Sequence, residues 1–142
     1  PEYIEAHGNP ATGAEMIADN HECLNLRFPG ATEFQWPLIT ENGTRKFKVP
    51  GRYESDDGDV LTDWALAGHG IALKPSFEVA DYISSGRLVP VAIQTQPETI
   101  QMACLFTHRR RQYPKTRLFM EFVIERIGKA IRNSMIQTQL PR

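Results

Sequence analysis

The stretch from Ser55 to Ser76 constrains the fold of this chain more than any other, because its structural signals follow one another directly. It reads SDDGDVLTDWALAGHGIALKPS, and its opening Ser and Asp residues are types preferred at helix N-caps. Apolar residues then recur at helical spacing, at Val60, Leu61, Trp64, Ala65 and Ala67. Gly68 supplies the left-handed residue that commonly ends a helix, so the pattern predicts a helix between Asp57 and Gly68.

The second half of this stretch predicts a strand followed by another helix. Ile71–Leu73 is a short apolar run of the kind found in buried strands. Pro75 and Ser76 suit the first turn of the next helix, which we expect over Phe77–Ser85. A helix, a tight turn, a strand and a second helix in this order are typical of an open α/β sheet. In such sheets, ligands bind at the carboxyl ends of the strands.

The chain before this stretch predicts further strands. His21–Phe28 alternates and reads as a strand, and Arg52–Ser55 reads as another. Glu33–Thr40 and Arg45–Val49 flank the dipeptide Asn42-Gly43, which is the strongest short-range hairpin signal. We also expect short helices at the N-terminal end of the chain, over residues 1–8 and 14–18.

The chain after this stretch predicts two strands and a long helix. Leu88–Ile93 and Thr99–Thr107 are apolar runs that we interpret as strands, joined by a polar linker that contains Pro97. From Lys115 to Met135, apolar residues recur every three or four positions, which predicts a single amphipathic helix.

Composition excludes several classes of protein. The chain has 142 residues, which is enough for one domain, with 16 basic and 17 acidic side chains. This balance argues against a nucleic-acid binder whose whole surface is basic, and we interpret the run Arg109–Arg111 as a solvated loop. No apolar run approaches the ~20 residues that a membrane span needs. No signal peptide is visible either, but the chain opens at Pro1, which reads as the interior of a longer protein.

Motifs for catalysis, metals and cofactors are missing from the sequence. The four histidines and two cysteines show no metal-ligand spacing, and no nucleophile elbow, phosphate loop or dinucleotide fingerprint occurs. We therefore expect no enzyme activity, no cofactor and no metal. Cys23 and Cys104 lie far apart, and we expect two buried thiols, with a disulfide left open.

An ordered set of motifs resembles the second half of the effector-binding domain of LysR-type transcriptional regulators. The set comprises Cys23–Arg27, Trp36, Gly51-Arg52, Asp56-Asp57, Ala65–Ala72, Pro75 and Gly86–Val91. The resemblance covers nearly the whole chain. His69 and Lys74 depart from the family pattern, which has apolar residues there. We interpret His69 as an exposed turn residue and Lys74 as a mark of local exposure.

This resemblance implies an α/β fold of the type 2 periplasmic-binding-protein kind, which is Rossmann-like with a mixed sheet. Residues 1–94 would form the second of two subdomains around a cleft. Residues 95–142 would return to the first subdomain with one strand and the C-terminal helix. The opening elements of the first subdomain and the DNA-binding helix-turn-helix domain would be absent from this chain.

The resemblance also implies a function in gene regulation. The parent protein would be a cytoplasmic homodimer or tetramer that binds a small-molecule effector and contacts DNA only through its N-terminal domain, with no membrane attachment. The alternative is a solute-binding protein of a transport system with the same fold. A small α/β enzyme is a third class, which we disfavour because no acid–base or nucleophile pair is evident.

Two sequence segments are the predicted effector site. Asn25, Arg27 and Phe28 end the first strand, and Asp56, Asp57 and Gly58 begin the central helix. Arg27 could bind an anion or simply pair with a carboxylate such as Asp56. Asp57 is first of all a helix cap, and Asp56 is the carboxylate expected to face the cleft. The acidic side chains here would repel an anion, so a hydroxyl, an amine or a neutral polar group fits better than a simple carboxylate.

Overall fold

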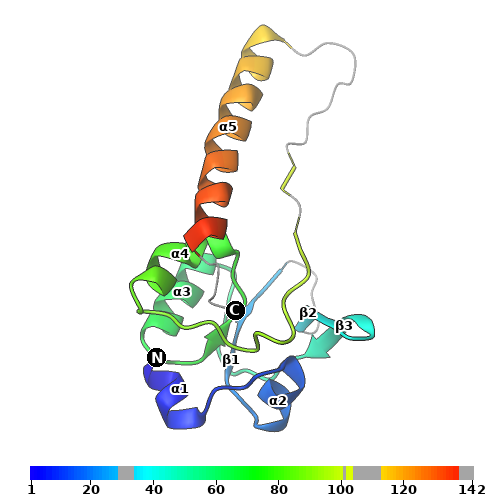
Figure 1. Cartoon of the computed structure of the whole chain (residues 1–142), viewed down its shortest axis with the longest axis vertical. Helices are drawn as coiled ribbons and strands as arrows, with labels where there is room; N and C mark the ends of the chain where they lie inside the picture. Colours follow the sequence, from blue (N-terminus) through cyan, green and yellow to red (C-terminus); the bar gives the residue numbers. More distant parts are fainter. Residues whose placement is uncertain (29–33, 101, 104–112, 138–142) are drawn as a thin grey trace.

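A parallel three-stranded sheet lies at the centre of the chain (Figure 1). The computed structural model describes residues 1–28, 34–100, 102–103 and 113–137. The central strand β1 (Cys23–Leu26) lies between β4 (Glu54–Ser55) and β5 (Ile71–Ala72). Cys23 pairs with Ile71 and Asn25 pairs with Glu54, both in parallel register. The carboxyl ends of the three strands therefore meet at one edge of the sheet.

A separate antiparallel hairpin is formed by β2 (Gln35–Thr40) and β3 (Gly43–Lys48). Gly43 adopts a φ of 96° at the turn, as the dipeptide Asn42-Gly43 predicts. Leu38 of β2 also forms an isolated bridge with Pro97. Parallel and antiparallel pairing thus both occur in this α/β fold, but in two different sheets.

The central helix α3 (Gly58–Leu66) packs against β1, as the sequence predicts. The Asp57 carboxylate accepts a hydrogen bond of 2.8 Å from the Asp59 N–H and caps its first turn. Gly68 has a φ of 75° just beyond its end, which confirms the predicted left-handed stop. Helix α4 (Ser76–Ser84) begins directly after Pro75, as expected.

Two short helices, α1 (Glu2–His7) and α2 (Gly13–Ala18), lie near the beginning of the sheet strands (Figure 1). Both were expected from the sequence. The N-cap of α2 is Thr12, whose hydroxyl accepts a hydrogen bond of 3.1 Å from the Glu15 N–H.

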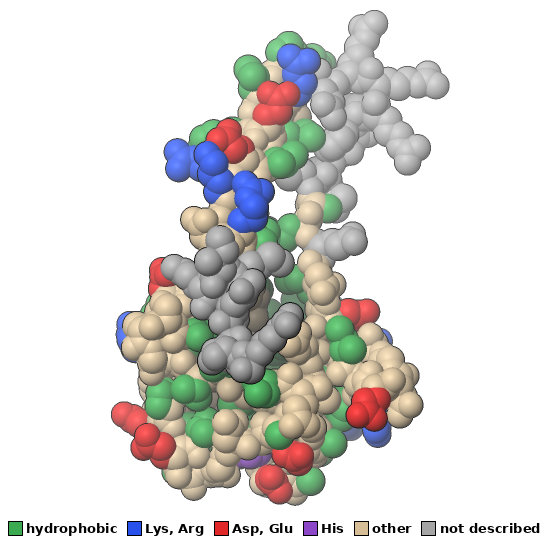
Figure 2. All heavy atoms as spheres, viewed as in Figure 1, with side chains coloured by type: hydrophobic (Ala, Val, Ile, Leu, Met, Phe, Trp, Pro, Cys, Tyr) green, Lys and Arg blue, Asp and Glu red, His purple; other side chains and the backbone are tan. Residues whose placement is uncertain are grey.

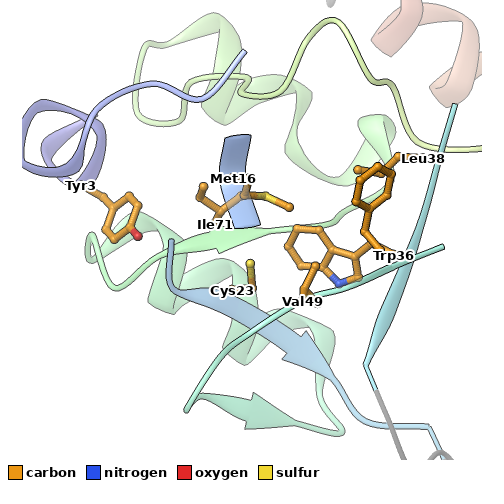
Figure 3. Close-up of a cluster of buried hydrophobic side chains, with 8 residues drawn as sticks. Tyr3, Met16, Cys23, Trp36, Leu38, Val49 and Ile71 are labelled. Carbon is orange, nitrogen blue, oxygen red and sulfur yellow. The ribbon is translucent and has the colours of Figure 1, made fainter. Parts of the chain in front are cut away.

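The core collects apolar side chains from α1, α2, β1, the hairpin and β5 (Figure 3). Its buried members are Tyr3, Met16, Cys23, Trp36, Leu38, Phe47, Val49 and Ile71. Leu24 and Leu61 are buried as well, where β1 meets α3. This packing joins the hairpin to the parallel sheet, although the two share no strand pairing.

The predicted strand Leu88–Ile93 is wrong. Its residues follow an irregular path. The Leu88 N–H donates to the Tyr82 carbonyl of α4 at 3.0 Å. The Ala92 N–H donates to the Pro10 carbonyl at 2.8 Å, and Ala92 itself has a φ of 51°. Pro90 has no N–H to offer to a ladder.

The predicted strand Thr99–Thr107 lies largely outside the described residues, and so do Cys104 and the run Arg109–Arg111. The residues of it that the structure describes (99, 100, 102 and 103) are not in a strand.

The long C-terminal helix α5 (Pro114–Gln137) confirms the prediction and projects away from the sheet (Figure 1). It contacts α4. Phe119 and Phe122 on this helix are 64% and 55% exposed. Figure 2 shows hydrophobic side chains beside charged ones on this projecting part. The apolar side of α5 is therefore largely uncovered in this chain.

Candidate effector site

The two predicted site segments meet at the carboxyl edge of the parallel sheet. The Arg27 N–H donates a hydrogen bond of 2.7 Å to the Ser55 carbonyl, which continues the pairing of β1 with β4. Residues 27–28 and residues 56–58 therefore leave neighbouring strands at the same edge of the sheet, and we call Arg27, Phe28 and Asp56–Gly58 the effector rim. Phe28 is an exposed aromatic residue on this rim.

Arg27 forms an ion pair with Glu54 of the neighbouring strand. A carboxylate partner was one of the two predicted roles of Arg27, but the partner is Glu54 and not Asp56. Both side chains are substantially exposed, so this pair contributes at most about 1 kcal/mol. A ligand can therefore compete for the guanidinium at little cost.

The aspartates at the start of α3 have different roles. Asp57 is the helix cap, and its own N–H already donates a hydrogen bond of 3.0 Å to the Ser55 hydroxyl. Asp56 is exposed on the rim. Asp56 is thus the carboxylate best placed to meet a ligand, whereas Asp57 stabilises the helix.

Lys74 is a buried cation beside the rim, and the sequence reasoning missed it. It follows β5, and its side chain is only 10% exposed, so the interpretation of Lys74 as a mark of exposure is wrong. Its ammonium group donates to the Gly58 carbonyl at 3.1 Å and pairs with Glu78 of α4. The starts of α3 and α4 converge on the end of β5, and Lys74 is enclosed between them. The four-residue spacing of Lys74 and Glu78 suits an ion pair on a helix, and it could have indicated from the sequence that Lys74 has a partner.

Asn25 lies beneath the rim rather than on it. It is 0% exposed, and neither atom of its side-chain amide has a hydrogen-bond partner among the described residues. A Cβ at Gly51 would lie 2.6 Å from the Asn25 Nδ2, so the backbone passes close by. A contact between Asn25 and an effector therefore stays a prediction. An effector would have to reach beneath the rim to contact this buried side chain.

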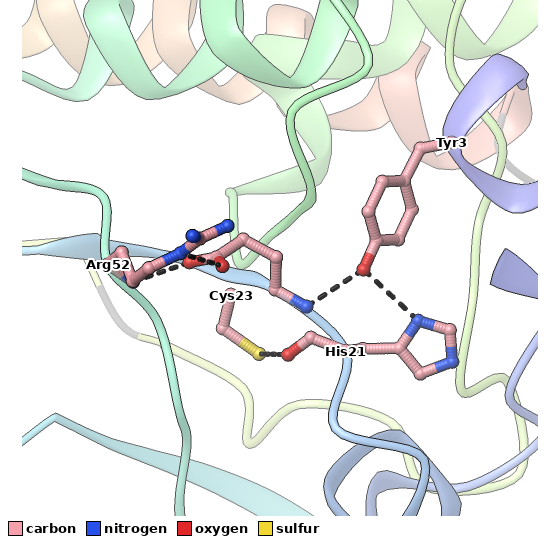
Figure 4. Close-up of polar contacts among 5 residues, drawn as sticks. Tyr3, His21, Cys23 and Arg52 are labelled. Atoms are coloured by element: carbon pink, nitrogen blue, oxygen red, sulfur yellow. Dashed lines mark hydrogen bonds and ion pairs between the residues drawn. The ribbon is translucent and has the colours of Figure 1, made fainter. Parts of the chain in front are cut away.

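A second polar cluster lies at the opposite, amino-terminal edge of the sheet (Figure 4). Tyr3 Oη lies 3.3 Å from His21 Nδ1 and accepts a hydrogen bond of 2.8 Å from the Glu22 N–H. Burial raises the pKa of Tyr3 and lowers the pKa of His21. Burial also raises the pKa of Cys23 to about 12, so this thiol is protonated and a poor nucleophile.

A mostly apolar cavity of ≈ 250 Å³ is partly open to solvent. Tyr3 and Ile4 of α1, Ile71 of β5 and Val79 of α4 line it, together with part of the irregular segment 88–97. Among the residues that the structure describes, no group of three His, Cys, Asp or Glu side chains could hold a metal ion. No helix in the described ranges is long and apolar enough to cross a membrane.

Comparison with known proteins identifies the family. The family model described as the LysR substrate binding domain matches residues 6–128. The chain belongs to the LysR substrate-binding domain family. Residues 6–128 include both halves of the effector rim.

Relatives of this LysR domain are transcriptional regulators. The chain is 29% identical over 129 residues to the HTH-type transcriptional regulator CrgA of Neisseria meningitidis serogroup C (strain 8013), covering 90% of this chain and 42% of CrgA. It is 31% identical over 136 residues to the HTH-type transcriptional activator TtdR of Escherichia coli (strain K12), covering 91% of this chain and 42% of TtdR. This LysR domain therefore spans about two fifths of the length of these curated relatives. The relatives give no support to the alternative of a transport solute-binding protein.

Solved structures agree with this assignment. The regulatory domain of CrgA, a LysR-type transcriptional regulator from Neisseria meningitidis, superposes with a TM-score of 0.73 at 27% identity, covering 90% of this chain and 61% of that one. Full-length AphB of Vibrio cholerae, a virulence activator of the same family, gives a TM-score of 0.67 at 26% identity, covering 89% and 42%. Both are LysR-type regulators, which confirms the fold class expected for this LysR domain.

Proposed function

We propose that this chain is the ligand-sensing part of a LysR-type regulator and binds a small-molecule effector at the effector rim. The observation that carries the proposal is the hydrogen bond from Arg27 to Ser55, which brings the two halves of the rim together. A guanidinium, an exposed aromatic ring and the exposed Asp56 carboxylate are then gathered at one edge of the sheet. Such polar groups at the carboxyl edge of a parallel sheet are suited to orienting a small molecule.

The effector would occupy a cleft between this subdomain and a second one. Residues 95–142 would belong to that second subdomain, which supplies the other wall of the cleft. The projecting position of α5 and its uncovered apolar side support this division. Binding would then change the relative setting of the two subdomains, and thereby DNA binding by a helix-turn-helix domain in a cytoplasmic homodimer or tetramer.

The charges at the rim favour an effector that donates hydrogen bonds over a simple carboxylate. Arg27 is paired with Glu54 and Lys74 with Glu78, which leaves the exposed Asp56 as an acceptor for a hydroxyl or an amine. An anionic ligand would have to displace Glu54 from Arg27 and approach Asp56 at the same time.

A thermal-shift screen of metabolites against a complete regulatory domain that carries this sequence tests the proposal. A ligand that binds the folded state raises its apparent stability, and we expect Asp56→Ala to reduce the shift produced by hydroxyl- or amine-bearing hits. A tenfold loss of affinity corresponds to about 1.4 kcal/mol.

Asp63→Ala is the matched control, because Asp63 is an exposed aspartate on the same helix, away from its first turn. It should leave the shift unchanged. Tight binding of a simple carboxylate that survives Asp56→Ala would contradict the proposed ligand chemistry.

A further inference from the structure

The contact between Tyr3 and His21 attaches α1 to the amino-terminal edge of the parallel sheet (Figure 4). Both side chains are nearly enclosed, since Tyr3 is 7% and His21 is 3% exposed. Their ring centroids lie 5.8 Å apart. Tyr3 also belongs to the hydrophobic core, so its position determines whether α1 is docked.

The hydrogen bonds around Tyr3 favour a neutral His21 in the docked form. The Tyr3 hydroxyl accepts from the Glu22 N–H at 2.8 Å, and its single proton is then available to His21 Nδ1. In this arrangement the neutral imidazole accepts at Nδ1 and carries its own proton on Nε2. A second proton on the imidazole would turn Nδ1 into a donor, so the Tyr3 hydroxyl would have to accept from it and turn its own proton away from His21.

Among the described residues near His21, one carboxylate is available to stabilise the positive charge of a protonated imidazole. Asp19, at the end of α2, favours the protonated ring. His7 of α1 disfavours it, and lies stacked on Tyr3 with ring centroids 4.3 Å apart. The carboxylate of Glu22 is engaged by Arg52, whose Nε lies 3.1 Å away.

We propose that the Tyr3–His21 contact is a pH-sensitive latch, and that protonation of His21 releases α1 from the sheet. The docked form holds neutral His21 in an enclosed site, whereas a released His21 would be hydrated and free to bind a proton. The released form then binds more protons, so docking loses stability as the pH falls below the ordinary histidine pKa of about 6.5. Burial lowers the pKa of docked His21 below that value, which is the direction expected if protonation favours the released form.

Release of α1 has two structural consequences. Tyr3 and Ile4 line the cavity of ≈ 250 Å³, so their departure removes part of its wall. A Cβ at Gly68 would lie 3.7 Å from the Glu2 carboxylate, which places α1 beside the turn that ends α3. One half of the effector rim lies at the other end of α3, so the latch borders a helix on which the rim depends.

Amide hydrogen exchange of the 142-residue chain, measured by NMR at pH 7.5 and pH 5.5, tests the latch. The reporters are the Gly8 N–H, which donates to Ile4 within α1, and the Glu22 N–H, which donates to Tyr3. We expect their protection factors to fall several-fold at pH 5.5. The Arg27 N–H, which donates to Ser55 at the far edge of the sheet, should keep its protection and so separate local release from global unfolding.

Histidine variants assign the effect to one ring. In His21→Asn the side-chain oxygen can still accept from Tyr3 but does not titrate, so the fall at pH 5.5 should disappear. His7→Gln and His69→Gln should retain the fall, because their rings do not accept the Tyr3 proton. Persistence of the fall in His21→Asn, or its loss in His69→Gln, would overturn the latch.

A direct titration keeps the proposal testable if His21→Asn fails to fold. The ring carbon and proton shifts of His21 in the unmodified chain should titrate below the ordinary histidine pKa of about 6.5. A folded-state titration at or above that value would overturn the latch.

Discussion

Gly51 is the residue at which the neighbouring chain segment passes closest to β1. A Cβ added at Gly51 would lie 2.0 Å from the Cys23 carbonyl oxygen and 2.6 Å from the Asn25 amide. The Cys23 N–H donates to the Pro50 carbonyl at 3.2 Å, so the close approach begins the pairing that leads into β4. Glycine is therefore needed here for space, and the effector rim depends on the same pairing.

We expect Gly51→Ala to lower the free energy of unfolding by about 1–3 kcal/mol, because the backbone must shift to admit the methyl group. Urea denaturation followed by circular dichroism measures the change. Gly128→Ala is the matched control, since Gly128 lies inside α5 and its Cβ would meet only the flexible end of Arg132. This control should be neutral, or should raise helix stability by about 0.5–1 kcal/mol. Equal effects of the two substitutions would contradict the close approach at Gly51.

At the scale of elements, α3 joins the fold to the site. One half of the rim, Asp56–Gly58, leads into its first turn, and its body packs on β1, β4 and β5. Asp57 caps the helix, and Lys74 bonds to the carbonyl of its first residue, Gly58. The position of the rim therefore depends on side chains that need not touch a ligand themselves.

Asp57→Ala should destabilise the chain by about 1 kcal/mol, because the Asp59 N–H at the start of α3 loses its acceptor. Chemical denaturation measures the loss, with Asp56→Ala as the comparison, because the Asp56 carboxylate is exposed and lies beside the cap. Asp56→Ala should change stability by less than about 0.5 kcal/mol. A larger loss for Asp56→Ala than for Asp57→Ala would reverse the roles assigned to the two aspartates.

At the scale of the whole molecule, the exposed apolar residues are concentrated in the projecting part of the chain (Figures 1 and 2). Those described there are Ile100, Met102, Tyr113, Leu118, Phe119, Phe122 and Ile124. Large contiguous apolar patches mark interaction sites in soluble proteins. This supports the proposal that the remainder of a regulatory domain covers α5.

Phe122→Ala tests this coverage by comparing two chain lengths. In the 142-residue chain Phe122 is 55% exposed, so we expect a change in unfolding free energy within about 0.5 kcal/mol. In a complete regulatory domain the same substitution should cost about 3–5 kcal/mol, because the ring becomes buried. Glu121→Ala, which removes an exposed partner of Arg117, should have a small effect in both chains. A small effect of Phe122→Ala in both chains would contradict coverage of this face.

Much of the fold follows from local signals in the sequence. The cap at Asp57, the stop at Gly68, the hairpin at Asn42-Gly43 and the spacing in α5 each predict an element that the structure contains. The strand predicted over Leu88–Ile93 does not form, because an apolar run does not reveal whether a neighbouring strand has free N–H and C=O groups to pair with.

The sequence by itself determined which segments are helices and turns, because caps, glycines and apolar periodicity act over a few residues. It also predicted that the residues of the proposed effector rim lie at strand ends. Only the tertiary structure decided that Arg27 pairs with Glu54 and that Lys74 is enclosed. It also decided that the Asn25 amide lies buried with no partner among the described residues. These outcomes depend on which distant segments pack together, and burial and charge pairing are properties of that packing rather than of the local sequence.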